Sequence, residues 1–147
     1  MNRKKYCYDY PRPSVTVDII LLAETDLSPQ ILLIERKHDP FSGMWALPGG
    51  FVDENEDLPD AAARELKEET GIENVPLIQF GAFGKPGRDP RGHTVSIAFL
   101  TTLSSIVKPV AGDDAANAKW FSIKNLPDLA FDHKEIINKV ILNNELK

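Results

Sequence analysis

The segment that most constrains the fold is residues 50–72, which read GFVDENEDLPDAAARELKEETGI. Asp57 is a residue type suited to a helix N-cap, and Pro59 is tolerated because it falls in the first turn. Gly71 is typical of the residue that ends a helix. The segment therefore predicts a helix with a defined start and a defined end.

Three carboxylates lie on one side of this helix. At about 100° per residue, Glu65, Glu68 and Glu69 share one arc because they are separated as i, i+3 and i+4. Like charges at this spacing destabilise a helix unless something positive neutralises them. Mg²⁺ takes oxygen ligands and binds carboxylates together with substrate phosphates, so the cluster points to phosphate chemistry. The alternative is a solvated helix face with surface ion pairs.

Two further charged residues are expected to orient this cluster. Arg64 can pair with Glu68 four residues later, and Glu56 at the helix entrance can brace Arg64 or interact with the helix dipole. The side of the helix next to the carboxylates is expected to face the core, and it contains Ala62, Ala63, Leu66 and Thr70.

The chain before the helix contains two apolar runs that are typical of buried strands. Residues 14–23 read SVTVDIILLA, residues 30–35 read QILLIE, and a polar TDLSP turn separates them. Aliphatic and β-branched runs joined by such a turn favour a hairpin. Residues 40–50, PFSGMWALPGG, break the pattern with glycines and prolines and predict a bend.

The chain after the helix alternates between strand and helix patterns without repeats. Residues 74–83, 94–103 and 118–123 are predicted strands. Asp132 and Glu135 resemble a capping box at the start of a last helix. The apolar stripe of that helix is expected in the core and consists of Ile136, Ile137, Val140 and Ile141.

Composition is that of one compact α/β domain, residues 1–147. The chain is 42% apolar and 27% charged, which is ordinary globular usage. A net charge of −5 gives no electrostatic footprint for nucleic acid or an anionic membrane. The single cysteine, Cys7, excludes an internal disulfide, and no apolar run reaches transmembrane or signal-peptide length. We therefore expect a cytoplasmic protein.

Residues 50–72 resemble the Nudix box at every specified position. That pattern is Gly, five residues, Glu, seven residues, Arg-Glu-aliphatic, one residue, Glu-Glu, one residue and Gly-aliphatic. The matching residues are Gly50, Glu56, Arg64, Glu65, Leu66, Glu68, Glu69, Gly71 and Ile72. The seven positions of fixed residue type, without the aliphatic Leu66 and Ile72, match by accident in roughly one window in 10^7. The resemblance to Nudix hydrolases covers nearly the whole chain and implies an α/β (α+β) fold, a mixed β-sheet sandwiched between α-helices.

The resemblance also implies a reaction and a metal site. Nudix hydrolases cleave nucleoside diphosphates linked to another group, at the pyrophosphate, with water and Mg²⁺ or Mn²⁺. The residues matching their metal ligands are Glu65, Glu68 and Glu69, with the backbone carbonyl of Gly49. Divalent ions polarise phosphoryl oxygens and lower the pKa of bound water, so the implied chemistry agrees with the carboxylate cluster.

The general base is expected either in the box or on a later loop, because family members differ. In the segment AGDDAANAKW, Asp114 lies six residues before Trp120, an offset at which some members carry an acid that completes the metal site. Asp114 is therefore both a catalytic and a metal-binding candidate, and the adjacent Asp113 competes with it. The alternative for both is an ordinary Gly-Asp-Asp turn.

Substrate choice depends on the loop FGKPGRDPRGHTVS. Arg88 and Arg91 make it cationic, and the planar arginine fork suits bidentate phosphate contacts. Pro86, about fifteen residues beyond Gly71, and the string GRDPRG are similar to the ADP-ribose pyrophosphatase subgroup. This resemblance implies ADP-ribose as substrate, with AMP and ribose 5-phosphate as products. The alternative is a hairpin loop in which Arg88 and Asp89 pair with neighbours.

Three residues outside these motifs also have expected roles. Arg36 follows a strand end and is a candidate phosphate contact, with a solvated turn as the alternative. Trp45 is expected to cap the core, although such an aromatic ring can also stack on a base. His133 in the segment FDHKE is predicted in the first turn of the last helix.

Two other functions are compatible with the family resemblance. Some Nudix-fold domains bind ADP-ribose without cleaving it, as the sensor half of repressors that carry a winged-helix domain and commonly lose acids of the box. Sanitising members hydrolyse nucleoside triphosphates instead. The unbroken box disfavours the sensor, and the Pro86 loop disfavours the triphosphate enzyme. Homodimers are common among ADP-ribose-type relatives, so a homodimer is a further expectation.

Overall fold

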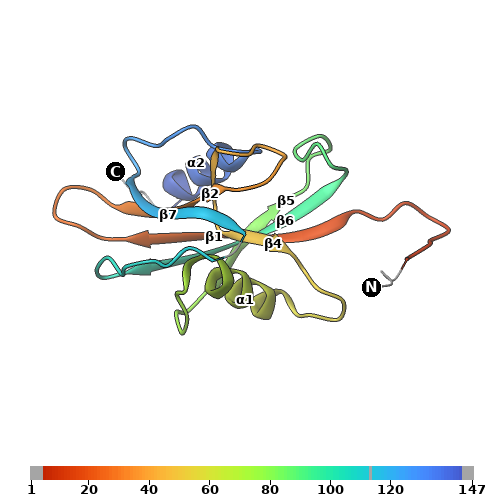
Figure 1. Ribbon diagram of the computed structural model, residues 1–147, viewed down its shortest axis with the longest axis horizontal. Helices are drawn as coiled ribbons and strands as arrows, with labels where there is room; N and C mark the ends of the chain where they lie inside the picture. Colours follow the sequence, from red (N-terminus) through yellow and green to blue (C-terminus); the bar gives the residue numbers. More distant parts are fainter. Residues whose placement is uncertain (1–4, 113, 144–147) are drawn as a thin grey trace.

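The structure is a computed structural model and describes residues 5–112 and 114–143. Seven strands form one sheet, with α2 on one face and α1 on the other (Figure 1). The elements are β1 (Ser14–Ala23), β2 (Gln30–Arg36), β3 (Trp45–Ala46), β4 (Gly49–Phe51), α1 (Leu58–Thr70), β5 (Ile78–Phe83), β6 (Thr94–Leu103), β7 (Ala115–Ser122) and α2 (His133–Asn143). Within the described ranges, no helix is long and apolar enough to cross a lipid bilayer.

The sheet is mixed, as the resemblance to Nudix hydrolases implied. Its strand order is β3-β2-β1-β6-β5, and β4 and β7 pair with β1 and β2 respectively. The long central strands β1 and β6 are parallel along their whole length, and the other pairings are antiparallel. A sheet of this kind with a helix on each face buries both faces of its central strands, which explains their nearly continuous apolar sequences.

Strand β1 changes its partner along one edge. At its C-terminal end, Leu22 and Ala23 pair with β2, whereas residues 16–18 pair with β4. The predicted hairpin between residues 14–23 and 30–35 is therefore correct only at its closed end. β2 leaves β1 after two residue pairs and continues with β7. The sheet is split beyond this point, and β4 fills part of the gap.

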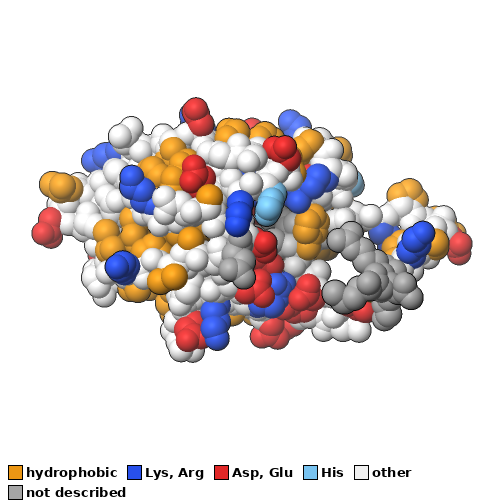
Figure 2. Space-filling view, viewed as in Figure 1, with side chains coloured by type: hydrophobic (Ala, Val, Ile, Leu, Met, Phe, Trp, Pro, Cys, Tyr) orange, Lys and Arg blue, Asp and Glu red, His pale blue; other side chains and the backbone are white. Residues whose placement is uncertain are grey.

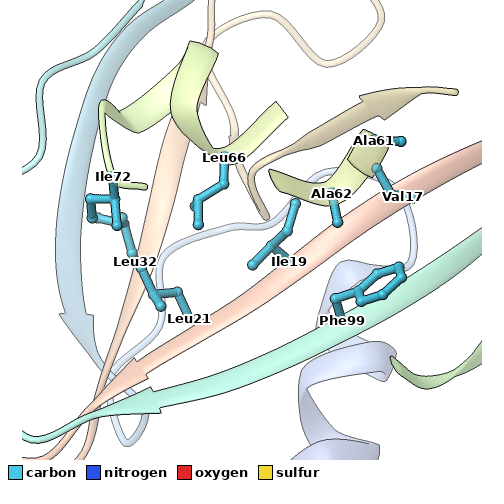
Figure 3. Close-up of a cluster of buried hydrophobic side chains, with 9 residues drawn as sticks. All are labelled: Val17, Ile19, Leu21, Leu32, Ala61, Ala62, Leu66, Ile72 and Phe99. Atoms are coloured by element: carbon cyan, nitrogen blue, oxygen red, sulfur yellow. The ribbon is translucent and has the colours of Figure 1, made fainter. Parts of the chain in front are cut away.

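The two faces of β1 support different helices because side chains alternate along a strand. Val17, Ile19 and Leu21 pack with α1 in one buried cluster (Figure 3). Ile20 and Leu22 pack with α2 in another. The even-numbered residues of β1 therefore face α2.

Helix α1 has the ends that the sequence predicted. Asp57 has an extended backbone, and its carboxylate accepts a hydrogen bond from the N–H of Leu58, while Gly71 ends the helix at φ 73°. The predicted core face is wrong at one position. Ala63 is exposed and Ala61 is buried instead, because the helix turns its Ala61–Ala62 pair towards β1.

Several predicted boundaries differ from the structure. The predicted bend at residues 40–50 contains the short strands β3 and β4, whose two and three residues are too few to give a strand pattern. Residues 74–77 precede β5 rather than belonging to it. β7 begins at Ala115, three residues before the predicted start.

Helix α2 buries the predicted stripe. Ile136, Ile137 and Val140 are buried, and Ile141 packs against the same cluster while partly exposed. The capping-box interpretation needs correction, because the Asp132 carboxylate accepts two hydrogen bonds from a distant arginine, Arg88. The backbone carbonyl of Asp132 still accepts the first helical hydrogen bonds, so the helix start itself is where the sequence placed it.

Candidate active site

A pocket of about 330 Å³ opens where β1 and β2 separate. Strands β1 to β4, both helices and the loops between the elements contribute its walls, and polar atoms predominate among them. The lining residues are Thr16, Asp18, Ile34, Arg36, Ala46, Leu47, Gly49, Gly50, Phe51, Asp53, Glu65, Glu69, Asp89, Arg91, Asp114, Phe131 and His133. On the face shown in Figure 2, acidic side chains gather over the α1 side of the molecule.

Glu69 is the most perturbed carboxylate of the pocket. It projects from the last turn of α1, and its Oε2 accepts a hydrogen bond from the N–H of Gly49 at 3.1 Å. The pKa of Glu69 is raised to about 8, mainly by burial and also by the negative charges of Glu65 and Asp18, against the hydrogen bond from Gly49. The pocket therefore holds a carboxyl group whose charged form is poorly solvated, and a cation bound there would stabilise that form.

Glu65 is buried one turn earlier on the same side of α1. Burial raises the pKa of its carboxyl, and the adjacent guanidinium of Arg64, 2.8 Å away, opposes the rise. A Cβ atom added to Gly50 would lie 2.6 Å from Oε1 of Glu65. The glycine in β4 therefore makes room for the carboxylate.

Arg64 connects the start of α1 to its carboxylates. Its Nε and Nη2 donate to both oxygens of Glu56 at 2.8 and 2.9 Å, which lowers the pKa of Glu56 to about 2. Nη2 also donates to the carbonyl of Phe51 at 3.0 Å, and Nη1 donates to Glu68 at 3.2 Å. Of the two roles considered for Glu56, the structure displays the contact with Arg64.

Glu68 and Asp114 occupy different places relative to the pocket. The Glu68 side chain is 56% exposed and lies outside the pocket lining, paired with Arg64. Asp114 lines the pocket from the residue directly before β7. The preceding loop is fixed to α1, because Gly112 donates from its N–H to the carbonyl of Glu69 at 3.2 Å. Asp113 lies outside the described residues.

Two of the three predicted substrate arginines line the pocket. Nε of Arg36 donates to the carbonyl of Pro40 at 2.7 Å, and burial together with the positive charge of Arg91 lowers the pKa of Arg36. Arg91 is held by the Asp89 carboxylate at 2.8 and 3.0 Å, with its guanidinium carbon 4.8 Å from the centre of the Phe51 ring. Two cations thus line the same pocket as the acids of α1.

Arg88 forms a buried ion pair outside the pocket. Its side chain is 4% exposed and pairs with both oxygens of Asp132 at 2.9 and 2.6 Å. It does not line the pocket. This pair connects the GRDPRG loop to the start of α2, and the neighbouring pair between Asp89 and Arg91 orients Arg91. Arg88 and Asp89 thus both pair with neighbours, as in the hairpin alternative, while Arg91 still lines the pocket.

Sequence reasoning did not identify Asp18, Ser96 or His133 as site residues. Asp18 on β1 is 7% exposed, accepts a short hydrogen bond from the Ser96 hydroxyl on β6, and lies 3.5 Å from Nε2 of His133 on α2. All three belong to the α2 side of the sheet. The available signal was a single carboxylate inside the apolar run SVTVDIILLA, since a buried charge in a strand requires partners.

The donor set of the pocket suits a hard divalent cation. Among residues 5–112 and 114–143, no three His, Cys, Asp or Glu side chains converge on one point that could hold a metal. Mg²⁺ does not need such a cage, because it keeps several waters and binds one or two carboxylates together with substrate phosphates. Glu65 and Glu69, both with raised pKa, supply carboxylate oxygens of the required kind.

A family model described as NUDIX domain matches residues 12–140. The chain belongs to this family. It is 47% identical over 137 residues to the ADP-ribose pyrophosphatase of Methanocaldococcus jannaschii, a match that covers 91% of this chain and 76% of that protein. The ADPR responsive transcriptional repressor NtrR of Acinetobacter baylyi is 34% identical, over 95% of this chain but only 58% of the repressor's length.

A solved structure confirms the fold. The NUDIX domain of Shewanella oneidensis NrtR, complexed with ADP ribose, superimposes with a TM-score of 0.86 at 30% identity and covers 92% of this chain and 93% of that domain. The expected Nudix fold, a mixed sheet between helices, is therefore confirmed. With a complete box and this family membership, the chain is a Nudix pyrophosphohydrolase.

Proposed function

We propose that this Nudix enzyme hydrolyses ADP-ribose to AMP and ribose 5-phosphate with Mg²⁺ or Mn²⁺. The observation that carries the proposal is one pocket in which Glu65 and Glu69 face Arg36 and Arg91. The diphosphate of ADP-ribose is anionic and needs both kinds of group, cations that bind its oxygens and carboxylates that hold a metal beside it. The similarity to the Methanocaldococcus jannaschii ADP-ribose pyrophosphatase supports this substrate.

The metal-binding groups in this proposal are the carboxylates of Glu65, Glu68, Glu69 and Asp114, with the carbonyl of Gly49. A divalent cation supplies charge neutralisation at the phosphates and an acidified water. Glu65 and Glu69 already line the pocket, and Asp114, directly before β7, lines it too. Glu68 lies on the exposed side of the cluster, where it holds Arg64. We assign Gly50, Glu56 and Arg64 to the support of these carboxylates.

The carboxylate that removes a proton from the attacking water is Glu69 or Asp114, because both line the pocket. Asp114 is exposed and therefore accessible to water. Asp114→Asn and Glu69→Gln variants distinguish the two by the pH profile of kcat, because the variant that lacks the base loses the acidic limb.

Arg36 and Arg91 bind the diphosphate in this proposal. They raise each other's electrostatic energy, which is why the pKa of Arg36 is lowered in part by Arg91. A bound anion relieves this repulsion. Arg88 acts indirectly, since its pairing with Asp132 fixes the loop that carries Arg91.

The first test measures products after incubation with Mg²⁺ and ADP-ribose, NADH, a dinucleoside polyphosphate and nucleoside triphosphates. We expect AMP from ADP-ribose as the preferred reaction, with Glu69→Gln lower in kcat by about 10²–10³-fold, the size seen when one preorganised electrostatic group is removed. Preferred release of pyrophosphate from a triphosphate would contradict the ADP-ribose proposal and leave the metal-site proposal intact.

A matched pair of variants tests the two arginines. Arg91→Ala is expected to raise KM for ADP-ribose about tenfold, consistent with the loss of about 1.4 kcal/mol from a charge-assisted contact. Arg88→Ala leaves the Asp132 carboxylate unpaired and is expected to lower the Tm. A KM unaffected by Arg91→Ala would remove Arg91 from the binding site.

A sensor is the second candidate, favoured by the likeness to the NrtR domain complexed with ADP ribose. It predicts binding of ADP-ribose, measured by calorimetry, without any release of AMP. The complete box opposes it, because Glu65 and Glu69 are both present and both line the pocket. Stoichiometric binding with no turnover at any metal concentration would replace the enzyme proposal with the sensor.

A further inference from the structure

His133 makes a buried contact with the backbone of the segment that leads into the active site. Its side chain is 4% exposed, and its Nδ1 accepts a hydrogen bond from the N–H of Leu47 at 3.0 Å. His133 is the first residue of α2, whereas Leu47 lies between β3 and β4. The contact therefore joins α2, on one face of the sheet, to the backbone between β3 and β4.

The tautomer of this imidazole is fixed by its surroundings. Burial lowers the pKa of His133, so the ring is neutral. Because Nδ1 accepts from Leu47, the proton is on Nε2, which lies 3.5 Å from Oδ1 of Asp18. The other oxygen of Asp18 accepts from the hydroxyl of Ser96. The Ser96 hydroxyl thus holds one oxygen of Asp18, and the other oxygen of Asp18 orients the His133 ring.

The presence of Asp, His and Ser does not make a nucleophilic triad here. In such a triad the hydroxyl donates to the imidazole, which in turn donates to the carboxylate. Here the Ser96 hydroxyl donates to Asp18, and the acceptor nitrogen of His133 is occupied by the N–H of Leu47. Neither the hydroxyl nor the imidazole is available as a nucleophile or base, so a role in positioning remains.

Two residues after Leu47, the same backbone segment contacts Glu69 through Gly49. The carbonyl of Pro48 accepts from the N–H of Ile19 at 2.8 Å, and the N–H of Gly49 donates to Oε2 of Glu69 at 3.1 Å. The fit is close, because a Cβ on Gly49 would lie 2.6 Å from Oδ1 of Asp18. A small shift of this backbone would change the distance between Gly49 and Glu69.

We propose that His133 is a positioning residue of the active site. It fixes the N–H of Leu47 so that Gly49 meets the Glu69 carboxylate, while Asp18 and Ser96 hold the imidazole in the required tautomer. The inference rests on the proposed function in one respect, that Glu69 binds the divalent cation. Groups that orient ligands in this way affect metal affinity about 10–100-fold when they are changed.

Two substitutions separate the two contacts of the ring. In His133→Asn the amide oxygen occupies nearly the place of Nδ1 and keeps an acceptor for Leu47. In His133→Gln the polar group lies near the place of Nε2, so the contact with Asp18 is kept and the one with Leu47 is lost. The primary measurement is Mn²⁺ affinity without substrate, by electron paramagnetic resonance. Circular dichroism and the Tm verify folding, and kcat and KM for ADP-ribose are measured in parallel.

We expect His133→Asn to bind Mn²⁺ within about threefold of the wild type, and His133→Gln to bind it about 10–100-fold more weakly. The kcat of His133→Gln should fall with KM little changed, because the carboxylate and not the arginines is displaced. Equal losses in both folded variants, or wild-type Mn²⁺ affinity in His133→Gln, would overturn the proposal.

A milder variant keeps the test decisive if His133→Gln does not fold. Ser96→Ala removes the donor to Asp18 and leaves the ring in place, so we expect a several-fold loss of Mn²⁺ affinity. An unchanged Mn²⁺ affinity in this variant would contradict the proposal. The Mn²⁺ measurement also separates this inference from the substrate proposal. If the wild type binds Mn²⁺ but does not cleave ADP-ribose, only the substrate proposal is wrong.

Discussion

The two ends of β1 differ in what they pair with and in what they contain. At the C-terminal end, Leu22 and Ala23 pair with β2 and are buried among apolar side chains. At the N-terminal end, residues 16–18 pair with β4, and Thr16 and Asp18 line the pocket. One strand thus carries a closed, apolar end and a split, polar end.

The difference indicates how this fold separates stability from chemistry. The closed end contributes burial of apolar area, which is the main favourable term in folding. The split end contains buried polar groups, which stabilise a structure only weakly even when they are satisfied. Substitutions at the closed end should therefore change the free energy of unfolding, and substitutions at the split end should change activity.

The largest expected effect is at the closed end. Leu22 is 2% exposed, so Leu22→Ala should lower the free energy of unfolding by about 2–5 kcal/mol through lost burial and a cavity. The kcat of the folded fraction should remain that of the wild type. Urea unfolding together with activity per folded molecule measures both. Val15→Ala on the same strand, where the side chain is 37% exposed, is the matched control and should change stability by less than about 1 kcal/mol.

The next effect is at the split end. Gly50→Ala places a methyl group within 2.6 Å of the Glu65 carboxylate, so Glu65 must move, and we expect a fall of about 10–100-fold in kcat with a small change in Tm. Gly81→Ala in β5 is the matched control, because a Cβ there meets no atom within 4 Å. Similar kinetics for the two variants would mean that the position of Glu65 does not matter for turnover.

The last expected effect is a pH dependence of stability caused by Glu69. Its pKa is about 8 in the folded protein and near 4.5 in the unfolded chain, so the folded state binds more protons between these values. The stability of the metal-free protein should therefore fall as pH rises from about 4.5 to 8.

Differential scanning calorimetry at pH 5 and pH 8 checks this dependence. Glu69→Gln cannot ionise, so it should match the wild type at pH 5 and exceed its Tm at pH 8 without metal. Mg²⁺ should raise the Tm of the wild type more at pH 8 than at pH 5, because protons compete for the carboxylate at low pH. A Tm difference between the variants that does not change with pH would exclude Glu69 as its source.

Local patterns in the sequence were sufficient for much of this molecule. The caps Asp57 and Gly71 defined α1, and the long apolar runs defined β1 and β6, because these signals depend on neighbouring residues only. The phase of Glu65 and Glu69 on α1 followed from the helical repeat. These features predicted the carboxylate side of the pocket.

The remaining features depend on contacts between distant residues. Asp132 was expected to cap its own helix, but it pairs with Arg88, 44 positions away. The parallel pairing of β1 with β6 brings Asp18 to Ser96, 78 positions later, and no local periodicity reports such a pairing. Ala63 was misplaced because the rotation of α1 on the sheet is set by packing and not by its sequence alone.

The fixed ends of α1 have a consequence for chain length. Asp57 caps the start of the helix, and Gly71 ends it in a left-handed conformation. Arg64 in the helix donates a hydrogen bond to Glu56, which precedes the helix. One inserted residue between Glu65 and Glu69 would rotate the second carboxylate by about 100° around the axis and carry it about 1.5 Å along it. This stretch therefore tolerates exchange of exposed side chains, such as Ala63, but not a change in the number of residues.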